Sequence, residues 1–115
     1  MKFGFTLGLL ITVISTNNAV ATEQISNNKT ITSVHSYLGG ATFKYTPSSS
    51  DNFGCTGVAA ARAVHIDWSA DDNYKAMYSL ALAAYSAGKT VGFGVDGCVS
   101  GNGGLIPKVY RVDVN

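Results

Sequence analysis

The sequence predicts a mainly β domain with one helix, arranged as a small five-stranded OB-like barrel, the oligonucleotide/oligosaccharide-binding type. Five short segments have the alternating or β-branched composition of strands, and one longer segment, residues 69–87, carries the start and stop signals of a helix. That helix falls between the third and the fourth strand, which is the order found in such barrels. A two-layer α+β sandwich is the alternative arrangement of these elements.

The N-terminal segment has the parts of a secretory signal. Lys2 precedes an apolar stretch over residues 3–14, and Ala19-Val20-Ala21 supplies the small residues that signal peptidase requires. The stretch is shorter than the ~20 residues of a membrane-spanning helix, although an uncleaved anchor is the alternative. We therefore expect residues 1–21 to be a cleaved signal peptide and residues 22–115 to form one domain, secreted or periplasmic, without a membrane span.

Charge and composition argue against several classes of partner. Lys2 is the only charged residue of the leader, so the eight basic and seven acidic residues of the full chain balance after its removal. A balanced surface offers no footprint for nucleic acid or an anionic membrane. Once the cysteines are oxidised, His35 and His65 with scattered carboxylates are too few for a metal site, so we expect neither a metal nor another cofactor.

Both cysteines, Cys55 and Cys98, lie in the exported part of the chain. An even number of cysteines in an oxidising compartment predicts a disulfide, and oxidation removes both thiols from the list of nucleophiles. The chain-entropy model gives a bridge that closes a loop of this size a stabilisation of about 4 kcal/mol. A reactive or metal-binding thiol is the alternative.

The first half of the domain reads as a polar lead-in, a hairpin and a loop. Residues 22–29 are polar, and we expect them to be mobile. Residues 31–37 and 41–45 are rich in β-branched and aromatic side chains on either side of Gly39-Gly40, which predicts two antiparallel strands and a turn. Residues 46–54 hold proline, serine, aspartate and asparagine, the composition of a loop.

A third strand is expected over Val58–Trp68. Within it, bulky apolar side chains alternate with small or polar ones, so we expect Val64 and Ile66 to enter the core and His65 and Asp67 to lie on the opposite, wetter face.

A helix follows, with Ser69 as the predicted N-cap and Ala87 as its last residue. Asp71 and Asp72 suit the positive end of the helix dipole, and Gly88 suits the left-handed residue after its end. Because the helix is apolar around most of its circumference, it needs a cover on more than one side, and a homo-oligomer would supply one.

Two strands complete the domain, one after the helix and one over residues 109–114, with a flexible turn at residues 101–104 between them. In the first of these strands, Gly92 and Gly94 alternate with Val91, Phe93 and Val95 and leave one face bare. A bare face of this kind suits close packing against a partner.

No residue is predicted to be catalytic. His65 and Asp67 point the same way from one strand and offer a general base with its orienting acid, but no serine lies in a turn that would expose and activate it. The favoured interpretation treats both as surface residues of a half-buried strand. A small hydrolase using this pair is the alternative.

The remaining features favour binding. Tyr37, Tyr45, Ser49, Asp51 and Asn52 combine flat aromatic faces with short hydrogen-bonding side chains, as sugar sites do, although the aromatic rings also suit the core. We therefore predict a non-enzymatic binding module whose ligand is a glycan or a partner protein. An exported inhibitor or protein-interaction factor is the alternative.

A family pattern runs from Trp68 to Cys98. An aromatic residue closes a strand, a helix follows with Met77 to Tyr85, and residues 86–91 lead through a glycine-lysine turn into the next strand. This pattern resembles the binding (B) subunits of subtilase-cytotoxin-like and pertussis-like bacterial toxins, and related small exported bacterial proteins. The resemblance implies an OB-type barrel in a ring of five subunits that binds cell-surface glycans and carries a separate enzymatic subunit. It assigns no site residue, because the glycan-contacting residues of those families have no matched positions here.

Overall fold

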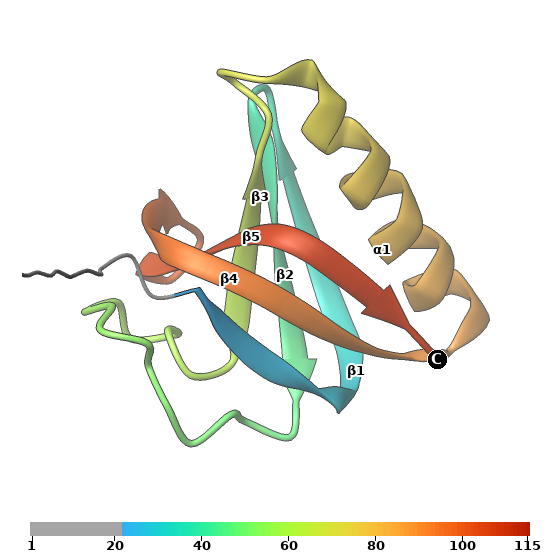
Figure 1. Cartoon of the computed structure of the whole chain (residues 1–115), viewed down its shortest axis with the longest axis horizontal. Coiled ribbons are helices and arrows are strands. Elements are labelled where there is room, and N and C mark those ends of the chain that lie inside the picture. Colours follow the sequence, from blue (N-terminus) through green and yellow to red (C-terminus); the bar gives the residue numbers. More distant parts are fainter. Residues whose placement is uncertain (1–21) are drawn as a thin grey trace, which may run out of the picture.

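The computed structural model describes residues 22–115, so the predicted signal peptide lies outside the described residues. Five strands, a short 3-10 helix and one α-helix make up the fold (Figure 1). In chain order they are β1 (Glu23–Tyr37), β2 (Gly40–Thr46), β3 (Ala63–Asp67), η2 (Asp72–Tyr74), α1 (Lys75–Ala87), β4 (Thr90–Gly101) and β5 (Gly104–Val114). Within residues 22–115 no helix has the length and apolar character to cross a membrane.

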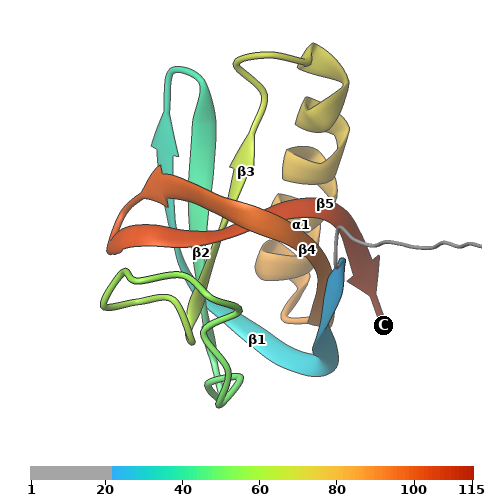
Figure 2. The same ribbon diagram turned by 60° about the vertical axis from the view of Figure 1, so that its left-hand side comes forward.

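The strands close into a barrel in the order β1-β2-β3-β5-β4. The barrel closes because the long, bent β1 is shared: its start pairs antiparallel with β4, from Glu23 opposite Val95, and its end pairs antiparallel with β2. β3 meets β5 in the only parallel pairing among the described strands, at His65 and Lys108. The α-helix lies along one side of the barrel (Figure 2). The predicted five-stranded OB-like barrel is confirmed, and so is the predicted hairpin of residues 31–37 and 41–45.

The N-terminal lead-in is a strand, contrary to our expectation that residues 22–29 are mobile. Glu23, Gln24 and Ile25 pair with β4, and Ile25 is buried in the core. The register then shifts between Ile25 and Lys29, so the polar residues between them leave the ladder. The segment is therefore a strand despite its polar composition, because Ile25 anchors it in the core and a bulge follows that residue.

The third strand is shorter than predicted, because residues 58–62 form a turn in which the Arg62 N–H donates to the Ala59 carbonyl. The α-helix also begins later, at Lys75. Asp71, not Ser69, accepts the capping hydrogen bond, from the Asn73 N–H at 2.9 Å, and it caps the 3-10 turn. The predicted helix end is confirmed, with Gly88 in the left-handed conformation at φ 67°.

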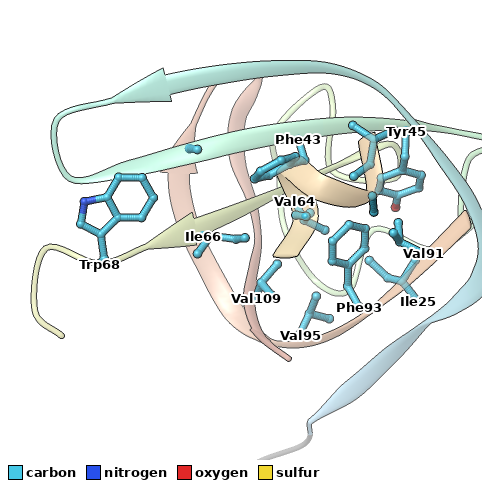
Figure 3. Packing of buried hydrophobic residues seen from close by; sticks show 14 residues of the cluster. Ile25, Phe43, Tyr45, Val64, Ile66, Trp68, Val91, Phe93, Val95 and Val109 are labelled. Atoms are coloured by element: carbon cyan, nitrogen blue, oxygen red, sulfur yellow. The ribbon is translucent and has the colours of Figure 1, made fainter. Parts of the chain in front are cut away.

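The core fills the barrel between its strands and α1 (Figure 3). Phe43 and Phe93 are fully buried at its centre. α1 contributes the small residues Ala81 and Ala84, which let it approach closely, while Tyr78 packs against the Trp68 ring with centroids 4.9 Å apart. The barrel therefore covers one side of α1, and the opposite side of the helix is exposed.

The predicted disulfide is present and links Cys55 to Cys98 with Cα atoms 5.8 Å apart. It ties the loop between β2 and β3 to β4. The chain itself fills the bare glycine face of β4, because the Asn27 side chain occupies the place of a Cβ at Gly92 and the Tyr110 ring lies 2.9 Å from that of Gly94. The expected close packing therefore comes from within the domain.

Candidate functional site

A pocket of about 380 Å³ opens at one end of the barrel, where the β1–β2 turn, β3 and the β4–β5 hairpin meet. We call it the His65 pocket. Its lining residues are Tyr37, Gly39, Gly40, His65, Asp67, Ser69, Ser100 and Gly101. The volume lies in the range of small-molecule sites. Barrels of this topology commonly bind oligonucleotides and oligosaccharides with this surface, formed by strands 2 and 3 and the turns after strands 1 and 4.

His65 forms the buried wall of the pocket. Our expectation of a surface histidine is wrong, since the residue is only 6% exposed. The β4–β5 hairpin lies over the outer face of β3, where Ala63 and Ile106 join Ala59 in a small second core. β3 is therefore buried on both faces, and the alternation of its side chains does not report exposure.

A hydrogen-bond chain fixes the imidazole. The Thr42 hydroxyl lies 2.7 Å from Nδ1 of His65 and also accepts from the Asn102 N–H at 3.0 Å. The buried Thr42 hydroxyl proton has no acceptor other than Nδ1 among residues 22–115, so the arrangement that satisfies it has the hydroxyl donating to Nδ1 and the imidazole proton on Nε2. Burial lowers the pKa of His65, and the nearby Asp67 carboxylate opposes this shift. The imidazole is consequently neutral at pH 7.

Asp67 supplies the charge of the pocket. One carboxylate oxygen, Oδ1, accepts from the Ser69 hydroxyl at 2.7 Å and from the Ser69 N–H at 2.8 Å. These two hydrogen bonds are the main reason that the pKa of Asp67 is lowered. The other oxygen, Oδ2, has no partner among residues 22–115. Asp67 therefore presents one open acceptor and a full negative charge.

Two glycines let the surrounding turns close over the imidazole. A Cβ at Gly40 would come within 2.5 Å of Nε2 of His65, and a Cβ at Gly101 would come within 2.9 Å of Nδ1. Both distances are shorter than any side chain tolerates, so only glycine fits at these positions. The Gly40 backbone thus approaches Nε2 without a side chain that would cover it.

Tyr37 provides the apolar wall. It is 47% exposed at the end of β1, and its ring centroid lies 6.2 Å from that of the His65 imidazole. The neighbouring Leu38 is fully exposed at the tip of the β1–β2 turn. An aromatic face therefore stands beside the polar floor of the pocket.

The structure does not bring the five predicted binding residues together. Tyr37 lies in the His65 pocket, whereas Ser49 and Asp51 line a second pocket of about 290 Å³ at the opposite end of β2. Tyr45 is buried and donates its hydroxyl proton to the Ala61 carbonyl, and the Asn52 side chain accepts from the Gly54 N–H. Tyr45 and Asn52 thus have structural contacts.

The second pocket contains a lysine that sequence reasoning did not single out. Lys29 is only 4% exposed, and its ammonium donates to the Ser48 carbonyl at 3.2 Å. The same ammonium lies 5.7 Å from the centroid of the Tyr45 ring, a cation–π distance. Lys29 therefore ties β1 to the loop that covers this end of the barrel. The bulge before it, which turns its side chain inward, leaves no signal in the sequence.

His65 and Asp67 line one pocket but do not form a base with its orienting acid. Nδ1 of His65 contacts Thr42, and the Asp67 carboxylate contacts Ser69. Thr42 and His65 have the distance of a nucleophile and its base, yet the Thr42 side chain is fully buried and out of reach of a substrate. Among residues 22–115 no group of three His, Cys, Asp or Glu side chains converges to hold a metal ion.

No protein-family model matches this sequence, and comparison with curated proteins gives no significant match.

Proposed function

We propose that this protein is a non-enzymatic sugar-binding module and that the His65 pocket is its binding site. One observation carries the proposal: a half-exposed aromatic ring, an open carboxylate oxygen and an open imidazole N–H line the same concave surface. A sugar has an apolar ring face and a rim of hydroxyl groups that both donate and accept. Tyr37 suits the face, and Asp67 and His65 suit the hydroxyl groups.

Two further lines of support are analogies. Barrels of this topology use the same surface for oligosaccharides. The segment from Trp68 to Cys98 resembles glycan-binding toxin subunits. The Cys55–Cys98 disulfide suits an oxidising compartment, so we propose that the protein acts outside the cytoplasm.

We also propose a homo-oligomer. The uncovered side of α1 carries four exposed apolar residues at helical spacing, Ala76, Leu80, Ala83 and Ala87. A second copy of the chain would cover this stripe, as the resemblance implies.

Protein binding is the second candidate function. Leu38 and Val58 are highly exposed, and Leu105 is half exposed next to the Gly57 backbone. Large apolar side chains at turn tips suit contact with a partner protein. This candidate predicts one stable protein complex that Leu38→Asp disrupts.

The sugar-binding proposal is tested by displaying the oxidised protein to a panel of neutral and acidic glycans. Free glycans that bind are then titrated, and Tyr37→Ala is expected to weaken affinity about tenfold, the value of a lost stacking contact. Tyr85→Ala is the matched control, because Tyr85 is similarly exposed on α1. Absence of binding to any glycan, or equal losses from both variants, would overturn the assignment.

A further inference from the structure

We infer that the His65 pocket selects neutral sugars that present two neighbouring hydroxyl groups, and that it rejects sugars bearing a carboxylate. This inference rests on the proposed function, since it specifies the class of sugar for the same pocket.

The acceptor side of the pocket is Asp67. Ser69 uses Oδ1 through both its N–H and its hydroxyl, so Oδ2 is left to accept from a ligand. A sugar hydroxyl donates to a carboxylate in a charge-assisted hydrogen bond, which is stronger than one between neutral groups. A ligand carboxylate has no proton to donate at neutral pH, and its charge has the same sign as that of Asp67.

The donor side is Nε2–H of His65. Thr42 occupies Nδ1, and Nε2 has no acceptor among residues 22–115 although the side chain is more than nine-tenths buried. A buried donor without a partner costs free energy, and a ligand oxygen at this point would remove that cost. Gly40 keeps the approach to Nε2 free of a side chain.

The donor and the acceptor come from residues two apart on one strand, so they project from the same face. A pair of neighbouring hydroxyl groups matches them, because one hydroxyl can accept from His65 while the other donates to Asp67. The half-exposed Tyr37 ring then lies beside the pair, where it can contact the apolar face of the sugar.

The charge balance excludes acidic sugars. No lysine or arginine is among the residues that line the pocket. Lys108, which pairs with His65 across β3 and β5, is the smallest of the causes that lower the pKa of Asp67, and it forms no ion pair with Asp67 within residues 22–115. A bound carboxylate would therefore lie beside an uncompensated negative charge in a partly desolvated pocket.

The test compares sugars that differ only in the carboxylate: glucose with glucuronic acid, and galactose with galacturonic acid. The full chain is expressed with its leader, purified in the oxidised form and titrated at pH 7.5. Amide NMR signals of Gly39, Gly40 and Gly101 report occupation of the pocket. We expect at least one neutral sugar to shift these signals, and its acidic counterpart to bind about tenfold or more weakly.

Asp67→Asn separates charge from shape. The amide keeps an acceptor for Ser69 and turns the open oxygen into a donor, so we expect neutral sugars to bind about tenfold more weakly and the discrimination against acidic sugars to fall below about threefold. Asp72→Asn removes the same charge from an exposed position at the start of the helix and should leave both affinities unchanged. The CD spectrum verifies that each variant folds.

The outcomes are distinguishable. Equal or tighter binding of the acidic sugars at the three glycines would overturn the inference and leave sugar binding in place. Acidic sugars that shift signals at Lys29 and Ser49 instead would assign them to the second pocket and would support exclusion from the first. No shift with any sugar, including glycans from the panel, would overturn the proposed function and the inference together.

Discussion

The Thr42 hydroxyl and Nδ1 of His65 lie 2.7 Å apart inside the domain, and their contact decides which imidazole nitrogen carries the proton. Thr42 belongs to β2 and His65 to β3, while the Asn102 N–H that completes the chain belongs to the β4–β5 turn. A single hydroxyl therefore joins three of the elements that form the pocket, and replacing it should affect both stability and proton position.

Thr42→Val keeps the shape of the side chain and removes the hydroxyl. We expect a loss of about 2 kcal/mol in the free energy of unfolding, because Nδ1 of His65 and the Asn102 N–H lose a partner in the interior. The imidazole ¹⁵N shifts should report a mixture of tautomers. Thr32→Val is the control, since its hydroxyl bonds the Lys44 carbonyl at an exposed site, and it should cost less than about 0.5 kcal/mol. Equal losses in the two variants would show that the buried hydrogen bonds of Thr42 contribute no more to stability than the exposed one of Thr32.

Stability should fall as the pH drops below about 6.5, the ordinary pKa of histidine. Burial lowers the pKa of His65 in the folded state, so the unfolded chain binds more protons in this window and stability decreases with decreasing pH. Urea unfolding between pH 7.5 and 5 measures the effect, and His65→Gln should remove it. The lowered pKa of Asp67 acts in a separate window, below about pH 4. A wild-type stability that stays flat from pH 7.5 to 5 contradicts the prediction.

The disulfide should clamp α1 and its neighbouring strands. Cys55 and Cys98 are 43 positions apart. The double replacement Cys55→Ala and Cys98→Ala should lower the free energy of unfolding by up to about 4 kcal/mol. Hydrogen exchange should show faster opening of α1, β3 and β4 together. Unchanged thermal stability would mean that the bridge contributes nothing.

Ile25→Ala tests whether the N-terminal segment is a structural strand. Ile25 is buried in the core, so the truncation should cost about 2–5 kcal/mol, as such cavities do. Val58→Ala removes a similar amount of apolar side chain at a highly exposed position and should be close to neutral. Urea denaturation measures both. If Ile25→Ala leaves the free energy of unfolding unchanged, residues 22–29 are a mobile lead-in and not a structural strand.

The mass of the oxidised protein in solution tests the proposed homo-oligomer. Sedimentation equilibrium should give a multiple of the mass of one purified chain, and Leu80→Asp in the exposed stripe of α1 should reduce it to the monomer. Leu105→Asp, at a comparably exposed residue on the β4–β5 hairpin, should leave the mass unchanged. A wild-type monomer at high concentration contradicts the ring that the toxin resemblance implies.

The fold was predictable because its signals are local. Gly39-Gly40 separates two segments of β-branched and aromatic residues, and the glycine after Ala87 suits the left-handed residue at a helix end; the structure has the hairpin and the helix end at these places. The position of one helix among five strands then limits the topology to few choices. The even pair of cysteines predicted the disulfide in the same way.

The site was less predictable because it depends on contacts between distant segments. His65 alternates with Val64 and Ile66 like a surface residue, but the β4–β5 hairpin covers that face of β3. Serine is a common helix cap, yet the Ser69 hydroxyl donates to the Asp67 carboxylate two residues earlier, and Asp71 accepts the capping hydrogen bond instead. Tyr37 is the one predicted binding residue that lines the His65 pocket.

β1 pairs with both β2 and β4, and this double pairing limits the order in which the strands of the barrel can assemble. Residues 30–37 meet β2 within a few residues of being synthesised, whereas Glu23 and Ile25 must wait for Val95 and Phe93, about two thirds of the chain later. The first residues of the domain to be synthesised are thus among the last to pair with a neighbouring strand. Until then the Ile25 side chain lacks its place in the core, and the barrel stays open between β1 and β4.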